Sequence, residues 1–198
     1  MKILDIFPTK ILGKILNNLS ERELNSYKDF IINDCSVNKE SSTRLKHTQN
    51  QQILNLPIFV NLKNNILKYS KAYLDNLELI YEDLQFACSW GNIVYKNGYS
   101  GAHHHNNSYL SGVFYFDYSS PISFFKSPNI HQGFKLDSKK ENDSNESFII
   151  DPKPNLLLIF PSTLNHCILP SSNDMRISIA FNIIPKGKFG FPTAGLNL

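Results

Sequence analysis

The chain has 198 residues, of which 41% are hydrophobic, 12% aromatic and 19% charged, and its formal net charge at pH 7 is +3. This composition is typical of a globular protein and excludes a disordered or fibrous chain. The length predicts one domain, residues 1–198, with a full core. The basic residues are spread along the chain, so no basic patch of the kind that nucleic-acid binding needs is evident.

The three cysteines, Cys35, Cys88 and Cys167, lie far apart and form no C-x-x-C pair. They predict neither a disulfide framework nor a zinc site of that type, and they favour a reducing compartment. The apolar amino-terminal stretch is interrupted by Asp5 and Pro8, so it resembles neither a signal-peptide core nor a membrane span. We therefore expect a cytoplasmic protein without a membrane partner.

The first part of the chain has a helical pattern. Ser20 and Glu23 form an S-x-x-E capping box, and the apolar residues that follow predict a helix over residues 20–33. The serine- and asparagine-rich stretch 36–52 is expected to be a loop. Pro57 then opens a longer helix. The apolar stripe of this helix consists of Leu62, Ile66, Tyr69, Tyr73 and Leu77.

From about Leu84 onward, β-branched and aromatic residues form short runs between clusters of Asn, Gly, Ser and Pro, which predicts strands. The eight runs are 84–96, 99–105, 109–118, 122–126, 147–151, 155–160, 166–169 and 176–184. Eight strands after two helices predict an α+β, mainly β fold: a jelly roll, with the helices of residues 1–80 packed on one sheet of the β-core 81–198. The polar segment 137–146 is expected to be an exposed hairpin loop or a lid.

Three of the six histidines are consecutive: His103, His104 and His105. Alternate side chains of a strand share a face, so His103 and His105 would point to one side and His104 to the other. Imidazole is a common ligand of iron, zinc, copper and nickel, which makes the outer two histidines candidate metal ligands. A polar loop that is rich in histidine is the alternative.

His166 lies in a strand candidate far from the triplet. Two ligands from one strand and a third from a distant strand can form a facial triad, which leaves open positions on the metal for oxygen and a co-substrate. We therefore predict a metal centre at His103, His105 and His166. A structural role for His166 is the alternative.

Arg176 and Ser178 share a face of the last predicted strand. A guanidinium that forks onto a carboxylate, with a hydroxyl beside it, suits the distal end of a dicarboxylate such as 2-oxoglutarate. A surface salt bridge of Arg176 is the alternative. Tyr115 and Asn182 are further candidates for the same cavity, where they either face a ligand or only fill space.

Several stretches of the chain carry motifs beyond these single residues: Trp90-Gly91-Asn92, the histidine triplet, residues 108–115, Phe160-Pro161-Ser162 and residues 176–182. Together with Phe7-Pro8-Thr9, they resemble a family of 2-oxoglutarate- and iron(II)-dependent oxygenases of phages and marine bacteria. The resemblance runs almost end to end. It implies a double-stranded β-helix, Fe(II) as the metal and 2-oxoglutarate as the oxidised co-substrate. If the protein is encoded by a phage, the expected location is the cytoplasm of the host cell.

The resemblance also implies roles for single residues. His103 and His166 match the two histidine ligands of the superfamily. Arg176 matches the basic residue that binds the co-substrate, and Ser178 completes an Arg-x-Ser pattern. Tyr95 stands where relatives often carry a tyrosine that contacts the co-substrate, although an ordinary strand aromatic is the alternative.

His105 departs from the superfamily pattern, because most members carry Asp or Glu two residues after the first ligand. A neutral imidazole there removes one negative charge from the iron. The implied activity is hydroxylation of an unidentified small molecule, peptide or protein. Two rivals stay open: a three-histidine cupin-type dioxygenase that needs no keto acid, and a non-catalytic jelly-roll binding module. The helical amino-terminal half is a candidate homodimer contact.

Overall fold

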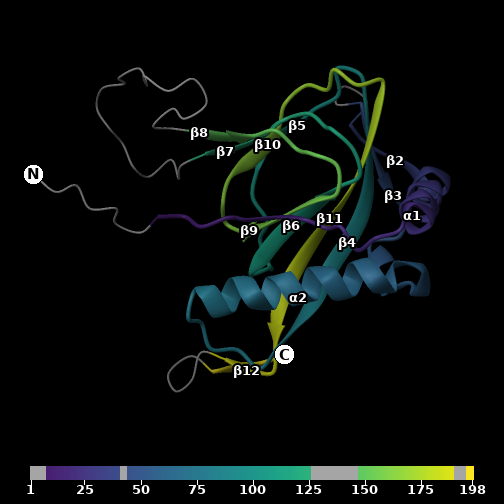
Figure 1. The fold of residues 1–198 in the computed structure, drawn as a ribbon. Helices are drawn as coiled ribbons and strands as arrows, with labels where there is room; N and C mark the ends of the chain where they lie inside the picture. Colours follow the sequence, from purple (N-terminus) through teal and green to yellow (C-terminus); the bar gives the residue numbers. More distant parts are fainter. Residues whose placement is uncertain (1–7, 41–43, 126–146, 190–194) are drawn as a thin grey trace, which may run out of the picture.

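The computed structural model describes residues 8–40, 44–125, 147–189 and 195–198. Two antiparallel sheets face each other, and the helices pack on the outer face of the larger one (Figure 1). The mainly β jelly roll with helices on one sheet, expected from the pattern of runs, is thereby confirmed. The segment 137–146, considered as a loop or lid, lies outside the described residues. No helix in the described part of the chain is both long enough and apolar enough to cross a membrane.

Helix α1 (Glu21–Asp34) begins at the capping box that the sequence predicts. Ser20 Oγ accepts a hydrogen bond from the backbone N–H of Glu23 at 3.3 Å, and the Ser20 N–H donates to the Glu23 carboxylate at 2.9 Å. These bonds satisfy two backbone donors of the first turn, which otherwise lack partners. On the buried face of α1, Tyr27 and Ile31 are fully covered by the larger sheet and its neighbours.

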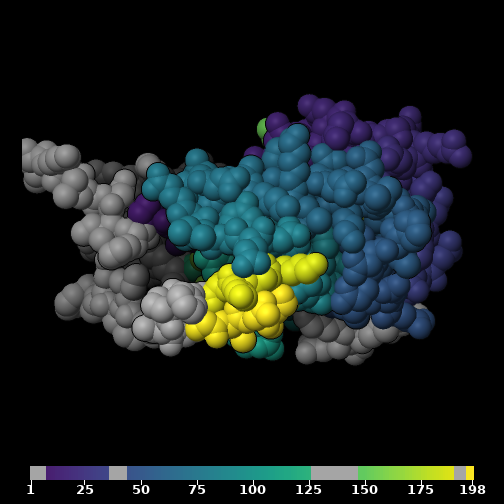
Figure 2. All heavy atoms as spheres, turned by 90° about the horizontal axis from the view of Figure 1, so that it is seen from below, coloured from purple at the N-terminus to yellow at the C-terminus, as the bar shows by residue number. Residues whose placement is uncertain are grey.

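Helix α2 (Val60–Asn76) is preceded by two short 3-10 turns, Ile53–Asn55 and Pro57–Phe59. Pro57 therefore opens a 3-10 turn that runs into the helix, because its fixed backbone angle suits the first position of either helix type. The predicted apolar stripe is buried at Leu62, Ile66 and Tyr73. Figure 2, seen from below, shows this helical region and the carboxyl-terminal segment together on one face of the molecule.

The strands of the β-core lie close to the predicted runs. Their bounds are β4 Asp83–Tyr95, β5 Ser100–His103, β6 Leu110–Tyr115, β7 Ile122–Phe125, β8 Ser147–Ile150, β9 Leu156–Pro161, β10 His166–Ile168 and β11 Met175–Lys186. The larger sheet has the order β1-β9-β6-β11-β4-β3-β2, and the smaller sheet has the order β5-β10-β7-β8. A short pair, β12 (Lys188–Phe189) and β13 (Leu196–Asn197), follows.

The loop expected over 36–52 is wrong for most of its length. Strands β2 (Cys35–Glu40) and β3 (Leu45–Thr48) form a hairpin there, and β3 pairs with β4 at the side of the larger sheet. The polar composition hid this hairpin because its strands are specified by backbone pairing, of β2 with β3 and of β3 with β4, rather than by a run of apolar residues. Strand β1 (Leu12–Ile15), which pairs with β9, was also not predicted, since four residues are too few for a pattern.

Strand β11 separates two apolar layers. Residues of one parity join the core beneath the helices: Ile177, Ile179, Phe181 and Ile183. Residues of the other parity, including Arg176 and Ser178, face the space between the two sheets. A second apolar cluster fills part of that space and includes Val113, Tyr115 and Phe160. The strand period of two thus places the site on the inner face of the larger sheet.

Candidate metal centre

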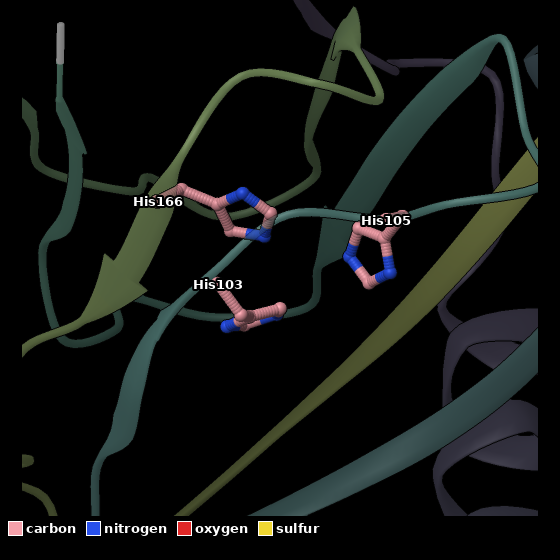
Figure 3. Close-up of side chains that lie close together, drawn as sticks. All are labelled: His103, His105 and His166. Carbon is pink, nitrogen blue, oxygen red and sulfur yellow. The ribbon is translucent and has the colours of Figure 1, made fainter. Parts of the chain in front are cut away.

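The structure brings His103, His105 and His166 together. One nitrogen from each ring can act as a ligand, and these three nitrogens lie within 4.8 Å of one another. Figure 3 shows the three rings around one point, with His103 and His166 coming from neighbouring strands and His105 from the segment after β5. His103 and His166 are directly opposite each other in the β5–β10 ladder. Pairing of distant strands therefore creates the cluster.

His105 reaches the cluster by a route different from the one expected. Strand β5 ends at His103, so simple strand alternation does not explain the shared direction of His103 and His105. Instead, the backbone N–H of His105 donates to the carbonyl of Ser162 at 2.9 Å, which ties the following segment to the end of β9. His104 is exposed, and its Nδ1 lies 3.2 Å from Asn165 Oδ1. The middle histidine is thus outside the cluster, as expected.

Backbone carbonyls fix the tautomers of two of the rings. His103 Nδ1 lies 2.7 Å from the carbonyl oxygen of Gly101, and His166 Nδ1 lies 2.9 Å from that of Leu164. A carbonyl oxygen only accepts, so each Nδ1 must carry the proton and donate. In the neutral ring the lone pair is then on Nε2. Such an anchored ring is typical of histidines that bind metals.

Burial keeps His166 neutral at physiological pH. The side chain is 5% exposed and lies against the rings of Phe124 and Phe160. Burial disfavours the charged imidazolium and lowers the pKa of His166 to about 4, although the hydrogen bond to Leu164 acts in the opposite direction. At pH 7 the ring can therefore offer a lone pair to a cation without first losing a proton.

Arg176 is a buried cation in the same cavity. Its side chain is 5% exposed, and Nη1 donates to Ser178 Oγ at 3.4 Å, while Nε has no hydrogen-bond partner among the residues that the structure describes. Burial lowers the pKa of the guanidinium below its usual value. No ion pair found among the described residues includes Arg176, so a surface salt bridge is not its role. A buried guanidinium without an anion is costly, which points to an anionic ligand.

Tyr115 provides a second buried donor near Arg176. It is fully buried, its hydroxyl lacks a hydrogen-bond partner, and it is paired with Ser178 across β6 and β11. Burial raises the pKa of Tyr115 to about 12, and the charge of Arg176 opposes this shift. The phenol therefore stays protonated at neutral pH and can donate to an anion.

Tyr95 does not join the cavity. It follows Asn92 on β4 by three residues, and strand alternation turns it to the opposite face. The residue is 36% exposed, and its ring centroid lies 5.7 Å from Lys46 Nζ. The family resemblance had implied Tyr95 as a co-substrate contact, with an ordinary strand aromatic as the alternative. The structure leaves Tyr95 outside the lining and places Tyr115, the other tyrosine considered for the cavity, close to Arg176.

Sequence reasoning missed part of the cavity lining. The residues around the cavity are Leu45, His47, Trp90, Asn92, Ser100, His103, His105, Gly112, Val113, Ile122, Phe160, His166, Ile168, Arg176, Ser178, Ala180 and Phe181. Leu45 and His47 belong to β3, so they were hidden in the expected loop. Their alternation with polar neighbours was the only signal for them. No carboxylate belongs to this lining, as far as the described part of the chain shows.

Residues 88–182 match the model of a family described as "Putative 2OG-Fe(II) oxygenase". This segment contains the three clustered histidines, Arg176 and Ser178. No match is found among curated proteins.

Solved structures share the fold over most of the chain. A prolyl-4-hydroxylase of Pseudomonas putida is 12% identical with a TM-score of 0.62, over 90% of this chain and 94% of that one. HygX of Streptomyces hygroscopicus, solved with nickel and 2-oxoglutarate bound, is 13% identical with a TM-score of 0.60, over 89% and 83%. SnoN, a non-heme alpha-ketoglutarate-dependent epimerase of nogalamycin biosynthesis, is 10% identical with a TM-score of 0.66, over 96% and 89%. At such identities the likeness shows the fold.

Proposed function

We propose that this chain is a 2-oxoglutarate-dependent dioxygenase that hydroxylates an organic substrate, and the match of residues 88–182 to the 2OG-Fe(II) oxygenase family model supports this proposal. One observation carries the proposal: three converging histidines line the same cavity as a buried guanidinium that is in no ion pair among the described residues. The histidines suit a metal, and the guanidinium suits a carboxylate. Few functions other than binding a metal together with an organic acid need both groups in one cavity.

His103, His105 and His166 are the proposed ligands of Fe(II). Neutral imidazoles are good ligands for Fe(II), and three of them on one side leave positions open on the other. The rings of His103 and His166 are held in the tautomer that leaves Nε2 free to bind a metal, because their Nδ1 protons are donated to backbone carbonyls. Phe160 and Phe124 pack against His166 and keep water away from this side of the site.

Arg176, Ser178 and Tyr115 are the proposed contacts of the distal carboxylate of 2-oxoglutarate. The unpartnered Arg176 Nε and Tyr115 hydroxyl are orphaned buried donors, and a carboxylate would satisfy both. Charge-assisted bonds from a guanidinium are the strong type, and its planar shape orients the acid. These residues therefore fit the co-substrate that the family name implies.

When bound, iron and 2-oxoglutarate would supply the oxidation: one oxygen atom of dioxygen converts a substrate C–H into C–OH, and the other enters succinate as 2-oxoglutarate loses carbon dioxide. The chain itself contributes binding, orientation and exclusion of water. Among the described residues, the cavity lining carries no negative side chain to offset Arg176. The electrostatic potential of the site consequently favours anionic ligands.

The wall formed by His47, Trp90 and Asn92 is the proposed substrate side. The rings of His47 and Trp90 lie 6.2 Å apart, and the rings of Trp90 and His105 lie 6.0 Å apart, so this wall leads directly to the proposed ligands. Trp90 Nε1 donates to Asn92 Oδ1 at 3.1 Å, which fixes the indole in place. This wall offers flat rings and an amide instead of charges, which suits a small molecule or a peptide side chain without charge at the reacting end.

The three-histidine donor set also favours a second candidate, a cupin-type dioxygenase that needs no keto acid. The buried Arg176 argues for 2-oxoglutarate, since such an enzyme has no use for a cation of this kind. The test is aerobic incubation of the purified protein with Fe(II) and 2-oxoglutarate, followed by measurement of succinate and carbon dioxide. Uncoupled turnover should release the two in equal amounts and should be lost in His166→Ala. Iron binding without any succinate would reject the proposal.

A further inference from the structure

We infer that Asn182 is a positioning residue that holds His105 in the tautomer needed for metal binding, an inference that rests on the proposed iron site. Asn182 lies on the inner face of β11 and is 7% exposed. Its amide Nδ2 lies 3.5 Å from His105 Nδ1. On its other side, Ser111 Oγ donates to Asn182 Oδ1 at 2.7 Å. Asn182 thus stands between a buried serine and one proposed ligand.

The position of Asn182 follows from strand register. It is paired with Cys88 of β4 and with Ser111 of β6, and Ser111 is paired with Phe160 of β9. These residues form one row across four neighbouring strands. Asn182 contacts the ring of His105, and Phe160 contacts the ring of His166 at a centroid distance of 5.0 Å. The row therefore supports two of the three histidines from the larger sheet.

The Nδ1 atom of each of the three histidines has a polar group behind the ring. For His103 and His166 this group is a backbone carbonyl that holds the Nδ1 proton, and His105 Nδ1 contacts the amide of Asn182. In Figure 3, one ring nitrogen of His105 faces the other histidines and the second faces away from them. For the inward nitrogen to keep its lone pair, the Nδ1 nitrogen must carry the proton and donate it to an acceptor.

An amide can provide that acceptor without disturbing its surroundings. The oxygen and nitrogen of an asparagine amide have nearly the same size, so a half-turn of the amide exchanges their places. Ser111 Oγ and Cys88 Sγ, which contact the amide at 2.7 and 3.3 Å, can each donate or accept. With the oxygen toward His105, Nδ1–H donates to Asn182 and the amide donates to Ser111. Every group in the row stays paired.

This arrangement also explains how the chain accommodates His105. A carboxylate ligand has two equivalent oxygens and needs no particular tautomer. A histidine offers its inward nitrogen to a metal in only one of two neutral forms, so His105 needs a proton acceptor behind the ring. The backbone bond from His105 to Ser162 fixes the main chain, and Asn182 sets the side chain.

The test is an anaerobic Co(II) titration of the full chain, followed by absorption, for the wild type and Asn182→Leu. Loss of a hydrogen-bond partner behind a ligand typically weakens metal affinity about 10–100-fold. We expect that loss in Asn182→Leu. Asn182→Asp should bind at least as tightly as the wild type, because its carboxylate accepts the Nδ1 proton. Asn65→Leu is the matched control, since Asn65 is equally buried at 7% exposure but lies in α2. It should leave Co(II) affinity unchanged.

A second readout follows the tautomer itself. Long-range proton–nitrogen NMR of the Zn(II)-loaded protein should show Nδ1–H at His105 in the wild type and Asn182→Asp. Asn182→Ser, a smaller change that tests the same contact if the leucine variant does not fold, should lose this signal and bind Co(II) less tightly. Wild-type affinity in both Asn182→Leu and Asn182→Ser, or equal weakening in Asn182→Asp, would overturn the inference and leave the iron site standing. Absence of Co(II) binding in the wild type would instead reject the proposed function itself.

Discussion

The two faces of the larger sheet use the same strand for opposite purposes. On the outer face, Ile179 and Ile183 of β11 are fully buried beneath α1 and α2. On the inner face, Arg176, Ser178 and Asn182 are buried as well, yet they are polar: Arg176 and Ser178 line the cavity, and Asn182 contacts His105. Burial alone therefore does not distinguish the core from the site. The distinguishing feature is whether each buried group finds its partner within the protein.

The apolar side chains on the outer face have no hydrogen-bonding groups, so close packing within the protein is all that they need. The inner face leaves Arg176 Nε and the Tyr115 hydroxyl without hydrogen-bond partners. Each unpaired buried donor costs about 1–3 kcal/mol. The contrast predicts that outer-face substitutions lower the free energy of unfolding and leave ligand binding unchanged. Substitutions of Arg176 or Ser178 on the inner face should instead weaken ligand binding without lowering the free energy of unfolding.

The largest effect is expected from Ile179→Ala on the outer face. Ile179 is 0% exposed, and removal of such a side chain leaves a cavity that costs about 2–5 kcal/mol of unfolding free energy. Denaturant unfolding monitored by fluorescence measures this loss. Affinity for Co(II), measured well below the unfolding midpoint, should match the wild type. A variant with normal stability and weakened metal binding would break the distinction between the faces.

Arg176→Leu should produce the opposite result. We expect the dissociation constant for 2-oxoglutarate to rise about 100-fold, or about 2.7 kcal/mol, because the charge-assisted contact is lost. The ligand-free protein should become more stable by about 1–3 kcal/mol, since a buried unpaired charge is replaced by an apolar side chain. Calorimetric titration and chemical unfolding measure the two quantities. Reduced stability together with unchanged 2-oxoglutarate affinity would show that Arg176 is structural.

His166 should make the stability of the metal-free protein depend on pH. Its pKa is about 4 in the folded protein, against 6.5 as the reference value. The unfolded state therefore binds the proton more readily, and the stabilising contribution is complete above about pH 6.5 and is lost as the pH falls toward 4. The loss should be on the order of 2 kcal/mol. Unfolding of the wild type and His166→Gln between pH 7 and pH 4.5 measures it, and equal slopes would contradict the assignment.

Ser178→Ala should have the smallest effect. The Ser178 hydroxyl is a neutral group beside Arg176, and a hydrogen bond of this kind contributes about 0.5–1.5 kcal/mol. The affinity for 2-oxoglutarate should fall a few-fold, with unfolding free energy nearly unchanged. Ser123→Ala, at another buried serine on β7, is a suitable control because Ser123 does not line the cavity. A 100-fold loss in Ser178→Ala would mean that the serine, and not Arg176, dominates co-substrate binding.

The periodicity of apolar residues and the spacing of motif residues correctly predicted the elements that a local sequence pattern specifies. The alternation along β11 indicated that Arg176 and Ser178 share a face, and the capping box located the start of α1. The closeness of His166 to His103 depends on pairing between distant strands, so spacing suggested it and only the fold could place it. The family resemblance supplied the same set of residues.

The sequence failed where tertiary pairing overrides local composition. The β2–β3 hairpin, which carries His47 into the cavity, is polar enough to resemble a loop. Tyr95 and Tyr115 are both strand tyrosines, and only the arrangement of the sheets decides which of them is buried near Arg176. The support of His105 by Asn182 was equally hidden, because the two residues are 77 positions apart. Such contacts lie beyond any local pattern.

The central claim is that one cavity holds a metal on the three histidines and 2-oxoglutarate on Arg176. Its most direct test is an anaerobic titration of the protein with Fe(II) and 2-oxoglutarate, followed through the metal-to-ligand charge-transfer absorption that appears only when the keto acid chelates the iron. The wild type should develop this band, His166→Ala should not, and Arg176→Leu should need about 100-fold more 2-oxoglutarate. A band of equal strength in His166→Ala, or its absence in the wild type, would contradict the claim.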